Sequence, residues 1–149
     1  MTIFKGSGVA LITPMKEDGS VDYEQLKELA EWHVQEGSDA IIACGTTGEA
    51  STLVDEEHLA VIDTVVKQVN GRIPVIAGTG SNDTKHGIFL SAEAEKLGVD
   101  GLFIVTPYYN TATKKSLVAH YEAIFSQVTI TLLLYSVPSR TAITLTVEM

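Results

Sequence analysis

Short apolar runs alternate along the chain with longer stretches in which every third or fourth residue is apolar. The short runs are typical of strands buried on both faces, and the longer stretches are typical of helices with one buried side. A strand and a helix together recur about every 30 residues, the length of a strand–helix–strand repeat. This order predicts an α/β fold with a parallel sheet. The predicted strands are residues 9–13, 40–44, 74–77, 102–105 and 130–135.

Residues that cap or end helices separate these elements. Ser20 or Asp22 can accept hydrogen bonds from the first amides of a helix, and Gly37 can adopt the conformation that ends it. Signals of this kind predict four helices, at about residues 20–37, 55–70, 82–97 and 113–127. Their predicted inward residues are Leu26, Leu29, Ala30 and His33; Leu59, Ile62, Val65, Val66 and Val69; Ile88, Ala92 and Leu97; and Leu117, Tyr121, Ile124 and Val128.

Four of the predicted strands end in turns rich in glycine, hydroxyl or aromatic residues, at 45–49, 77–80, 106–110 and 135–140. The carboxyl ends of parallel strands meet at one edge, where the active sites of (β/α)8 barrels lie, and a closed barrel takes about 250 residues. The chain has 149 residues. We therefore expect residues 1–149 to be one domain, the N-terminal portion of a (β/α)8 TIM barrel, with about five parallel strands and four helices and without the C-terminal portion.

Composition excludes several classes of function. Apolar residues make up 45% of the chain, as in globular proteins with a packed core. The net charge is −9, with only 10 Lys plus Arg, so no nucleic-acid partner is expected. The chain shows neither a signal peptide pattern nor an apolar run long enough for a membrane span. Cys44 is the only cysteine, which fits a reducing, cytoplasmic location.

The loop Gly45-Thr-Thr-Gly-Glu49 is the strongest candidate binding segment. Its glycines let the backbone turn tightly and let a ligand approach, while its hydroxyls and amides can hold a small carboxylate. Structural interpretations stay open beside this one. Thr46 and Thr47 can cap a helix, Tyr135 can be a half-buried structural residue, and Arg140 can be a solvated charge.

The sequence offers no pattern for a metal ion or a nucleotide cofactor. The four histidines fall on predicted helices without a shared metal-ligand spacing: His33, His58, His86 and His120. The turn at 78–80 lacks the further glycine and the acidic residue of a dinucleotide site. We therefore interpret it as a strand-to-helix turn and expect no metal and no cofactor.

Five segments, in order along the chain, resemble a known family. They are GSGVALITP at 6–14, CGTTGEA at 44–50, RIPVIAGTG at 72–80, VTPYYN at 105–110 and LYSVPSRT at 134–141. On these segments the chain resembles the N-terminal part of the dihydrodipicolinate synthase family, within the pyruvate-dependent class I aldolases. The GTTGE loop alone indicates only that superfamily, because sialate lyases carry a close variant, whereas PYYN and an arginine after the fifth strand favour the synthases.

The resemblance implies a chemistry and a set of site residues. In the family, a lysine forms a Schiff base with pyruvate, and the derived enamine attacks aspartate semialdehyde in lysine and diaminopimelate biosynthesis. The resemblance implies that Tyr135 is the central proton carrier and that Thr46 links it to Tyr109, which reaches into a neighbouring subunit. It further implies that Thr47 binds the pyruvate carboxylate and Arg140 the carboxylate of the second substrate. The covalent pyruvate adduct then takes the place of a cofactor, and a homo-oligomer is expected.

The chain departs from the family pattern in two ways. The family's Schiff-base lysine lies on the sixth strand, beyond residue 149, and no lysine present falls at a predicted strand end. We therefore expect the isolated chain to be inactive. The family's lysine feedback site is matched in part, because Asn82, His58 and Tyr108 are compatible but His86 replaces a common acid.

Two classes of function remain open from the sequence. The first is an enzyme, a synthase or part of one, that is active when another chain supplies the lysine. The second is a non-catalytic half-barrel folding module whose open sheet edges promote self-association. A related pyruvate lyase or aldolase is a third possibility, which the PYYN segment and Arg140 disfavour.

Overall fold

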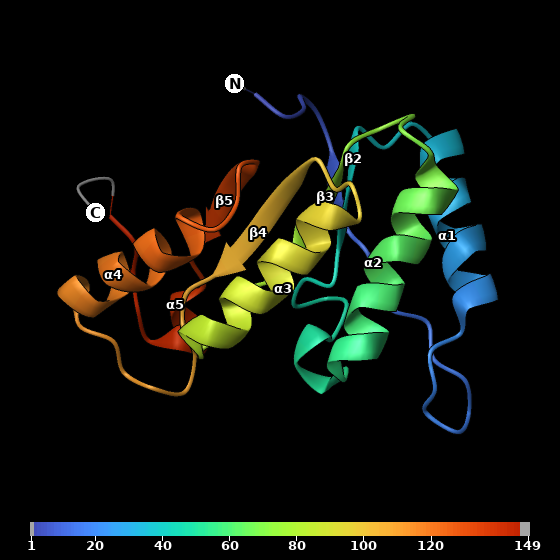
Figure 1. The fold of residues 1–149 in the computed structure, drawn as a ribbon. Coiled ribbons are helices and arrows are strands. Elements are labelled where there is room, and N and C mark those ends of the chain that lie inside the picture. Colours follow the sequence, from blue (N-terminus) through green and yellow to red (C-terminus); the bar gives the residue numbers. More distant parts are fainter. Residues whose placement is uncertain (1, 147–149) are drawn as a thin grey trace.

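The computed structural model describes residues 2–146, which form a five-stranded sheet with its four long helices over one face (Figure 1). The strands are β1 (Gly8–Ala10), β2 (Ala40–Ala43), β3 (Val75–Gly78), β4 (Gly101–Val105) and β5 (Thr131–Tyr135). The helices are α1 (Tyr23–Gln35), α2 (Asp55–Val69), α3 (Thr84–Lys96), α4 (Lys114–Phe125) and α5 (Pro138–Thr141), with a 3-10 turn at Ala50–Thr52.

The five strands are parallel and lie side by side in the order of the sequence. In the register, Ile41 pairs with Val75 and Leu102 pairs with Leu132. The structure therefore confirms the predicted α/β architecture of a partial barrel. Because all strands run in one direction, the loops that follow them gather at a single edge, which we call the carboxyl edge.

Two elements near the ends of the sheet differ from the prediction. β1 spans only the three residues Gly8–Ala10 and so ends before the predicted residue 13, although the Leu11 amide still donates to the Ile42 carbonyl of β2 at 3.0 Å. The segment after β5 forms α5, a single turn of four residues where no helix was predicted. Pro138 stands in its first turn, and the ring of proline holds φ near the helical value there.

A side-chain cap marks the start of α1, and a left-handed residue marks the end of α2. Asp22, and not Ser20, caps α1, because its carboxylate accepts a hydrogen bond from the Gln25 amide at 3.1 Å. The Ser20 hydroxyl donates instead to Asp18 at 2.7 Å. α2 ends at Asn70 as predicted, in the left-handed conformation with φ of 50°.

The buried face of α3 is offset from the predicted one. Its buried residues are Gly87, Leu90, Ser91 and Ala94, whereas the predicted Ile88, Ala92 and Leu97 are half-buried. A Cβ on Gly87 would lie 3.2 Å from Cδ1 of Ile124, so α3 approaches α4 through a residue without a side chain. The prediction relied on the spacing of bulky apolar residues, so it did not identify a buried face that is made largely of small residues. The other predicted inward residues that are only half-buried are Leu29, His33, Leu59, Val66 and Val128.

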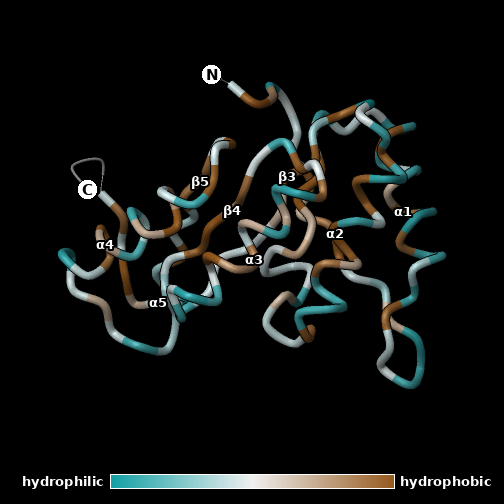
Figure 2. Tube along the Cα trace, in the orientation of Figure 1, coloured by the Kyte–Doolittle hydropathy of each residue, from teal (hydrophilic) through white to brown (hydrophobic). Residues whose placement is uncertain are grey.

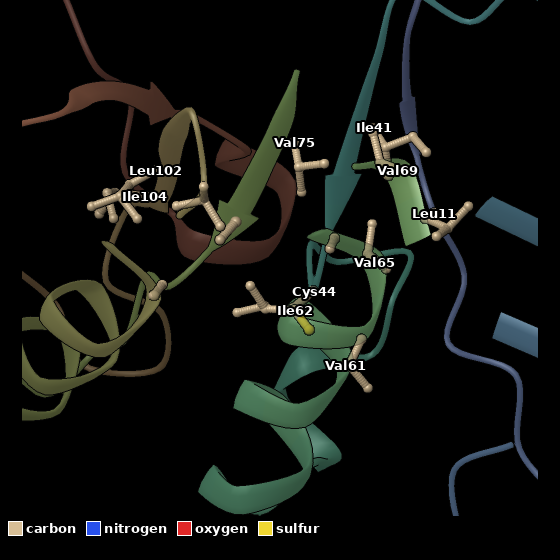
Figure 3. Packing of buried hydrophobic residues seen from close by; sticks show 14 of the residues in the cluster. Leu11, Ile41, Cys44, Val61, Ile62, Val65, Val69, Val75, Leu102 and Ile104 are labelled. Carbon is tan, nitrogen blue, oxygen red and sulfur yellow. The ribbon is translucent and has the colours of Figure 1, made fainter. Parts of the chain in front are cut away.

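The core lies between the sheet and the helices α1 to α4, and Figure 3 shows the part of it around α2. Ile41, Ile62, Val65 and Val75 are each at most 3% exposed. Figure 2 shows hydrophobic colour along the strands and alternating colours along α1 and α2, as expected for helices with one buried side. Burial of these apolar side chains is the main stabilising contribution to the fold.

The sheet is less covered at β5. Leu134 is 49% exposed and Phe125 of α4 is 60% exposed. Together with Leu145 they line an apolar groove of about 680 Å³. Tyr121 also lines this groove; its buried hydroxyl has no hydrogen-bond partner within residues 2–146, and burial raises its pKa to about 12.

Candidate active site

A pocket of about 350 Å³ lies at the carboxyl edge of the sheet. Its walls come from the ends of β2, β3, β4 and β5 and the loops after them, with further side chains from α2 and α3. Thr46, Tyr135 and Arg140 are among its lining residues. Three of the five residues predicted for the site are therefore brought together by one pocket.

The loop after β2 forms a compact turn. The Gly48 amide donates to the Gly45 carbonyl at 3.1 Å, and the Glu49 amide donates to the Thr46 carbonyl at 3.2 Å. The Thr46 and Thr47 amides have no protein acceptor among the described residues. Because both threonines are exposed, these two amides and two hydroxyls can bind an anionic oxygen.

Tyr135 ends β5 and is held by an aromatic neighbour. Its ring stacks on Phe103 of β4, with centroids 4.6 Å apart. The Tyr135 carbonyl also accepts a hydrogen bond from the Thr106 amide at 3.0 Å. The tyrosine is half-buried, so its phenol combines a fixed ring with access to the pocket. A phenol placed in this way can donate and accept protons.

Arg140 reaches the pocket from α5. Its amide donates to the Val137 carbonyl at 2.9 Å, so the residue sits on a hydrogen-bonded turn. The guanidinium is exposed and forms no ion pair with any residue in the described part of the chain. It is therefore available for a carboxylate, which the planar arrangement of its donors suits.

The structure does not bring the other two predicted residues into the pocket. Thr47 belongs to the turn beside Thr46 but is not among the lining residues. Tyr109 is 98% exposed and has φ of 71°, a left-handed conformation that is uncommon for residues other than glycine. Within one chain, the predicted link from Thr46 to Tyr109 is absent among the described hydrogen bonds. The neighbouring Tyr108 does line the pocket.

Two histidines line the pocket, His58 from α2 and His86 from α3. The buried His58 donates through Nε2 to the Gly78 carbonyl at 2.7 Å, and burial lowers the pKa of its imidazole. His86 contacts Asp55 through Nε2 at 2.8 Å and Ser81 Oγ through Nδ1 at 3.1 Å. Both ring nitrogens of His86 are therefore occupied by neighbouring side chains.

The Cys44 thiol is an unsuitable nucleophile for this pocket. The residue is 3% exposed, and burial raises the pKa of its thiol to about 12. A thiol with such a pKa stays protonated near neutral pH, whereas the thiolate is the reactive form. No lysine occurs among the described residues that line the pocket. The visible groups can bind carboxylates and move protons, but they do not include an amine.

Other kinds of site are not seen in the part of the chain that the structure describes. Residues 2–146 contain no group of three or more His, Cys, Asp or Glu that could hold a metal ion. None of the helices among these residues has the length and apolar character needed to cross a bilayer.

Three buried threonines at the carboxyl edge were missed from the sequence. Thr13 and Thr106 each follow an apolar strand segment and precede a proline, and Thr141 lies beside Arg140 in α5. Their hydroxyls bond to other loops and side chains at this edge. The signal that could have found them is the repeated pattern of two aliphatic residues, Thr and Pro at 11–14 and 104–107.

Comparison with known proteins places this site in context. The model of the dihydrodipicolinate synthetase family matches residues 3–149. The chain is 55% identical over 148 residues to a 4-hydroxy-tetrahydrodipicolinate synthase of Caldicellulosiruptor saccharolyticus, covering 99% of this chain and 50% of the relative. It is 53% identical over 146 residues to the synthase of Geobacter metallireducens, covering 98% of this chain and 50% of the relative.

Solved structures show the same fold. The dihydrodipicolinate synthase from Acinetobacter baumannii, complexed with pyruvate, aligns with a TM-score of 0.92 and 51% identity over 95% of this chain and 48% of that one. A dihydrodipicolinate synthase from Bacillus anthracis aligns with a TM-score of 0.96 and 37% identity over 99% of this chain and 51% of that one. The chain thus spans about half the length of the curated relatives it matches.

Proposed function

Because the chain belongs to the dihydrodipicolinate synthetase family, we propose that it supplies half of a 4-hydroxy-tetrahydrodipicolinate synthase active site. In this proposal the enzyme condenses pyruvate with aspartate semialdehyde in the cytoplasm, and the Schiff-base lysine comes from polypeptide outside residues 1–149. The observation that carries the proposal is the single pocket lined by Thr46, Tyr135 and Arg140.

Each group in and beside the pocket has a task that fits its chemistry. The unpaired amides and hydroxyls of Thr46 and Thr47 would hold the pyruvate carboxylate, because charge-assisted hydrogen bonds to an anion are the stronger kind. The Tyr135 phenol would carry protons as the imine forms and becomes an enamine. Arg140 would hold the carboxylate of the semialdehyde with two parallel hydrogen bonds. The missing amine is the one group that positioning residues cannot replace.

The exposed Tyr109 supports a homo-oligomer in this proposal. The residue is 98% exposed in a single chain, and its backbone has a left-handed conformation that is uncommon for a large aromatic residue. A tyrosine held in this way fits contact with a second copy better than contact with solvent. We therefore propose that Tyr109 completes the proton relay of a neighbouring copy.

Ligand titration tests the binding half of the proposal. Adding pyruvate to the 15N-labelled chain should shift the amide resonances of residues 45–49 and of Tyr135, while those of α1 stay unchanged. Each hydrogen bond contributes only about 0.5–1.5 kcal/mol in a site open to water, so binding should be in the millimolar range. If pyruvate shifts no resonance in the loop, or shifts α1 equally, the assignment of a carboxylate site is wrong.

Complementation tests the catalytic half. The chain alone should give no turnover and no borohydride-trapped pyruvate adduct by mass spectrometry. Turnover should appear when the unmatched half of the Caldicellulosiruptor saccharolyticus synthase is added, and Tyr135→Phe should then lower it about 100-fold, a typical loss for a proton-transfer group. Turnover or a lysine adduct in the chain alone would show that the nucleophile lies within residues 1–149.

A self-associating half-barrel module is the second candidate, and the groove beside β5 favours it. Leu134 and Phe125 expose apolar surface next to an edge strand, an arrangement that promotes association. Because both candidates allow self-association, sedimentation at several concentrations is combined with pyruvate titration, with no complementing polypeptide present, to separate the two functions. Stable dimers that bind no pyruvate would favour the module, whereas pyruvate binding favours the half-site.

A further inference from the structure

Two strands of the sheet lead into the same local structure. Thr13 and Thr106 come after β1 and β4, and each is followed by a proline. Their side chains are buried, at 6% and 0% exposure. A residue before proline is restricted to extended backbone conformations, so the following proline limits the backbone freedom of each threonine.

Thr13 holds the loop that follows β2. Its hydroxyl donates to the Gly48 carbonyl at 2.7 Å. A Cβ on Gly48 would lie 3.0 Å from the Leu11 carbonyl oxygen, so the loop rests directly on the segment after β1. Gly48 lies in the same turn as Thr46 and Thr47, and anchoring its carbonyl therefore orients their unpaired amides.

Thr106 holds the turn that follows β5 in the same way. Its hydroxyl donates to Thr141 Oγ1 at 3.0 Å, and the Thr141 hydroxyl lies 3.2 Å from the Val137 carbonyl within the same turn. Thr141 is next to Arg140, so the bond anchors the base of the arginine side chain. In both cases the donor and its partner are 35 residues apart, one strand–helix unit along the barrel.

We propose that Thr13 and Thr106 are a repeated pair of positioning residues, each fixing the carboxylate-binding loop of the next strand. The inference rests on the proposed function, because it takes these two loops as the substrate-binding ones. Neither hydroxyl lines the pocket, so both act through the loops and not on substrate. Removing the Thr13 hydroxyl leaves the buried Gly48 carbonyl without a partner among the described residues. Removing the Thr106 hydroxyl leaves Thr141 Oγ1 with contacts inside its own turn only, so in both cases the loop loses the bond that ties it to the preceding strand segment.

Hydrogen exchange in the ligand-free chain tests the positioning without relying on any substrate. Thr13→Val keeps the size of the side chain and removes its hydroxyl, and it should raise exchange of the Gly48 and Glu49 amides about tenfold. Thr106→Val should raise exchange of the Thr141 and Ala142 amides to a similar extent and leave amide exchange at residues 45–49 unchanged. The corresponding serine variants, which keep the hydroxyl, should restore wild-type exchange.

A matched control separates positioning from general destabilisation. Thr79 is as buried as the other two, but its hydroxyl pairs with Ser91 on α3 and not with a substrate loop. Thr79→Val should leave exchange in both loops unchanged. The proposal is wrong if amide exchange in either loop does not change when the threonine that bonds to that loop is replaced by valine. It is also wrong if one valine variant raises exchange equally in both loops, or if Thr79→Val raises exchange in them as well.

Pyruvate titration then connects the loops to binding. Thr13→Val should weaken pyruvate binding about tenfold, and Thr13→Ser should restore it. Thr106→Val should leave pyruvate affinity unchanged, because Thr106 holds the Arg140 turn. If Thr13→Val raises amide exchange in the loop at 45–49 but leaves the affinity for pyruvate unchanged, the positioning role of Thr13 is wrong. Absence of binding in the wild-type chain would instead overturn the proposed function, and the exchange data would still decide whether the threonines hold the loops.

Discussion

β3 and β5 are both apolar strands of one parallel sheet, yet they differ in their surroundings. All four residues of β3 are buried, whereas no residue of β5 is, since its residues are exposed or half-buried. β3 has a strand on each side and long helices before and after it, while β5 pairs with β4 alone and is followed by a four-residue helix. The burial of each strand is thus set by its neighbours and not by its composition.

The candidate site lies across both regions. The loop with Thr46 rests on the well-packed side of the sheet, whereas Tyr135 and Arg140 belong to the less covered side. We therefore expect the loop at residues 45–49 to keep its geometry under conditions in which β5 detaches from the sheet. The following changes test this comparison, in order of decreasing effect.

The largest effect should come from shortening a buried leucine of β4 and an exposed leucine of β5. Leu102 of β4 is fully buried, whereas Leu134 of β5 is 49% exposed. Leu102→Ala should lower the free energy of unfolding by about 3 kcal/mol and Leu134→Ala by less than about 1 kcal/mol, because only the first leaves a cavity. Urea unfolding followed by circular dichroism measures both. Equal losses would mean that β5 is packed as well as the centre of the sheet.

Adding one methyl group should reveal the tight backbone packing beside β3. A Cβ on Gly78 would lie 2.1 Å from the Cys44 carbonyl oxygen, so the strands would have to move apart. Gly78→Ala should cost about 1–3 kcal/mol of stability. Gly45→Ala is the control, since its Cβ would meet only Ile42 Cγ2 at 3.8 Å. A stable Gly78→Ala protein would show that this edge of the sheet can shift.

Protonation of His58 should weaken the packed region as the pH falls. Burial lowers the pKa of His58 below its ordinary value of 6.5. The unfolded chain therefore binds a proton that the folded chain excludes, so stability is present above about pH 6.5 and declines below it. The pKa of His120 is lowered in the same direction. Urea midpoints at several pH values should decline less in His58→Gln, and an unchanged slope would contradict the assignment.

The smallest effect should come from the exposed ion pair between α1 and the segment after α2. Arg72 holds the Glu31 carboxylate at 2.6 Å and, together with hydrogen bonds from Gln68 and Gln35, lowers its pKa from 4.5 to about 2. The pair is stabilising above pH 4.5 and is lost between pH 4.5 and about 2 as the carboxylate is protonated. Glu31→Gln should remove this part of the acid dependence and leave stability at pH 7 nearly unchanged, since solvent screens such pairs.

Local patterns were sufficient for much of this molecule. The alternation of apolar and amphipathic segments predicted five parallel strands and four long helices, and Asp22 and Asn70 were identified among the residues that bound them. The loop at 45–49 was also evident, because glycines beside hydroxyl residues after an apolar strand favour a tight turn that a ligand can approach. These features depend on residues close in sequence, whose conformational preferences act within a few positions.

The residues that meet in space could be identified only from the folded chain. The buried face of α3 depends on the contact between Gly87 and Ile124, and the exposure of Tyr109 depends on the loop that carries it. The bonds of Thr13 and Thr106 join residues that are 35 positions apart. Local sequence was enough to specify the elements and the chemistry at their ends. The assembled sheet set the partners, because contacts between neighbouring strands join residues that are far apart along the chain, beyond the reach of local conformational preferences.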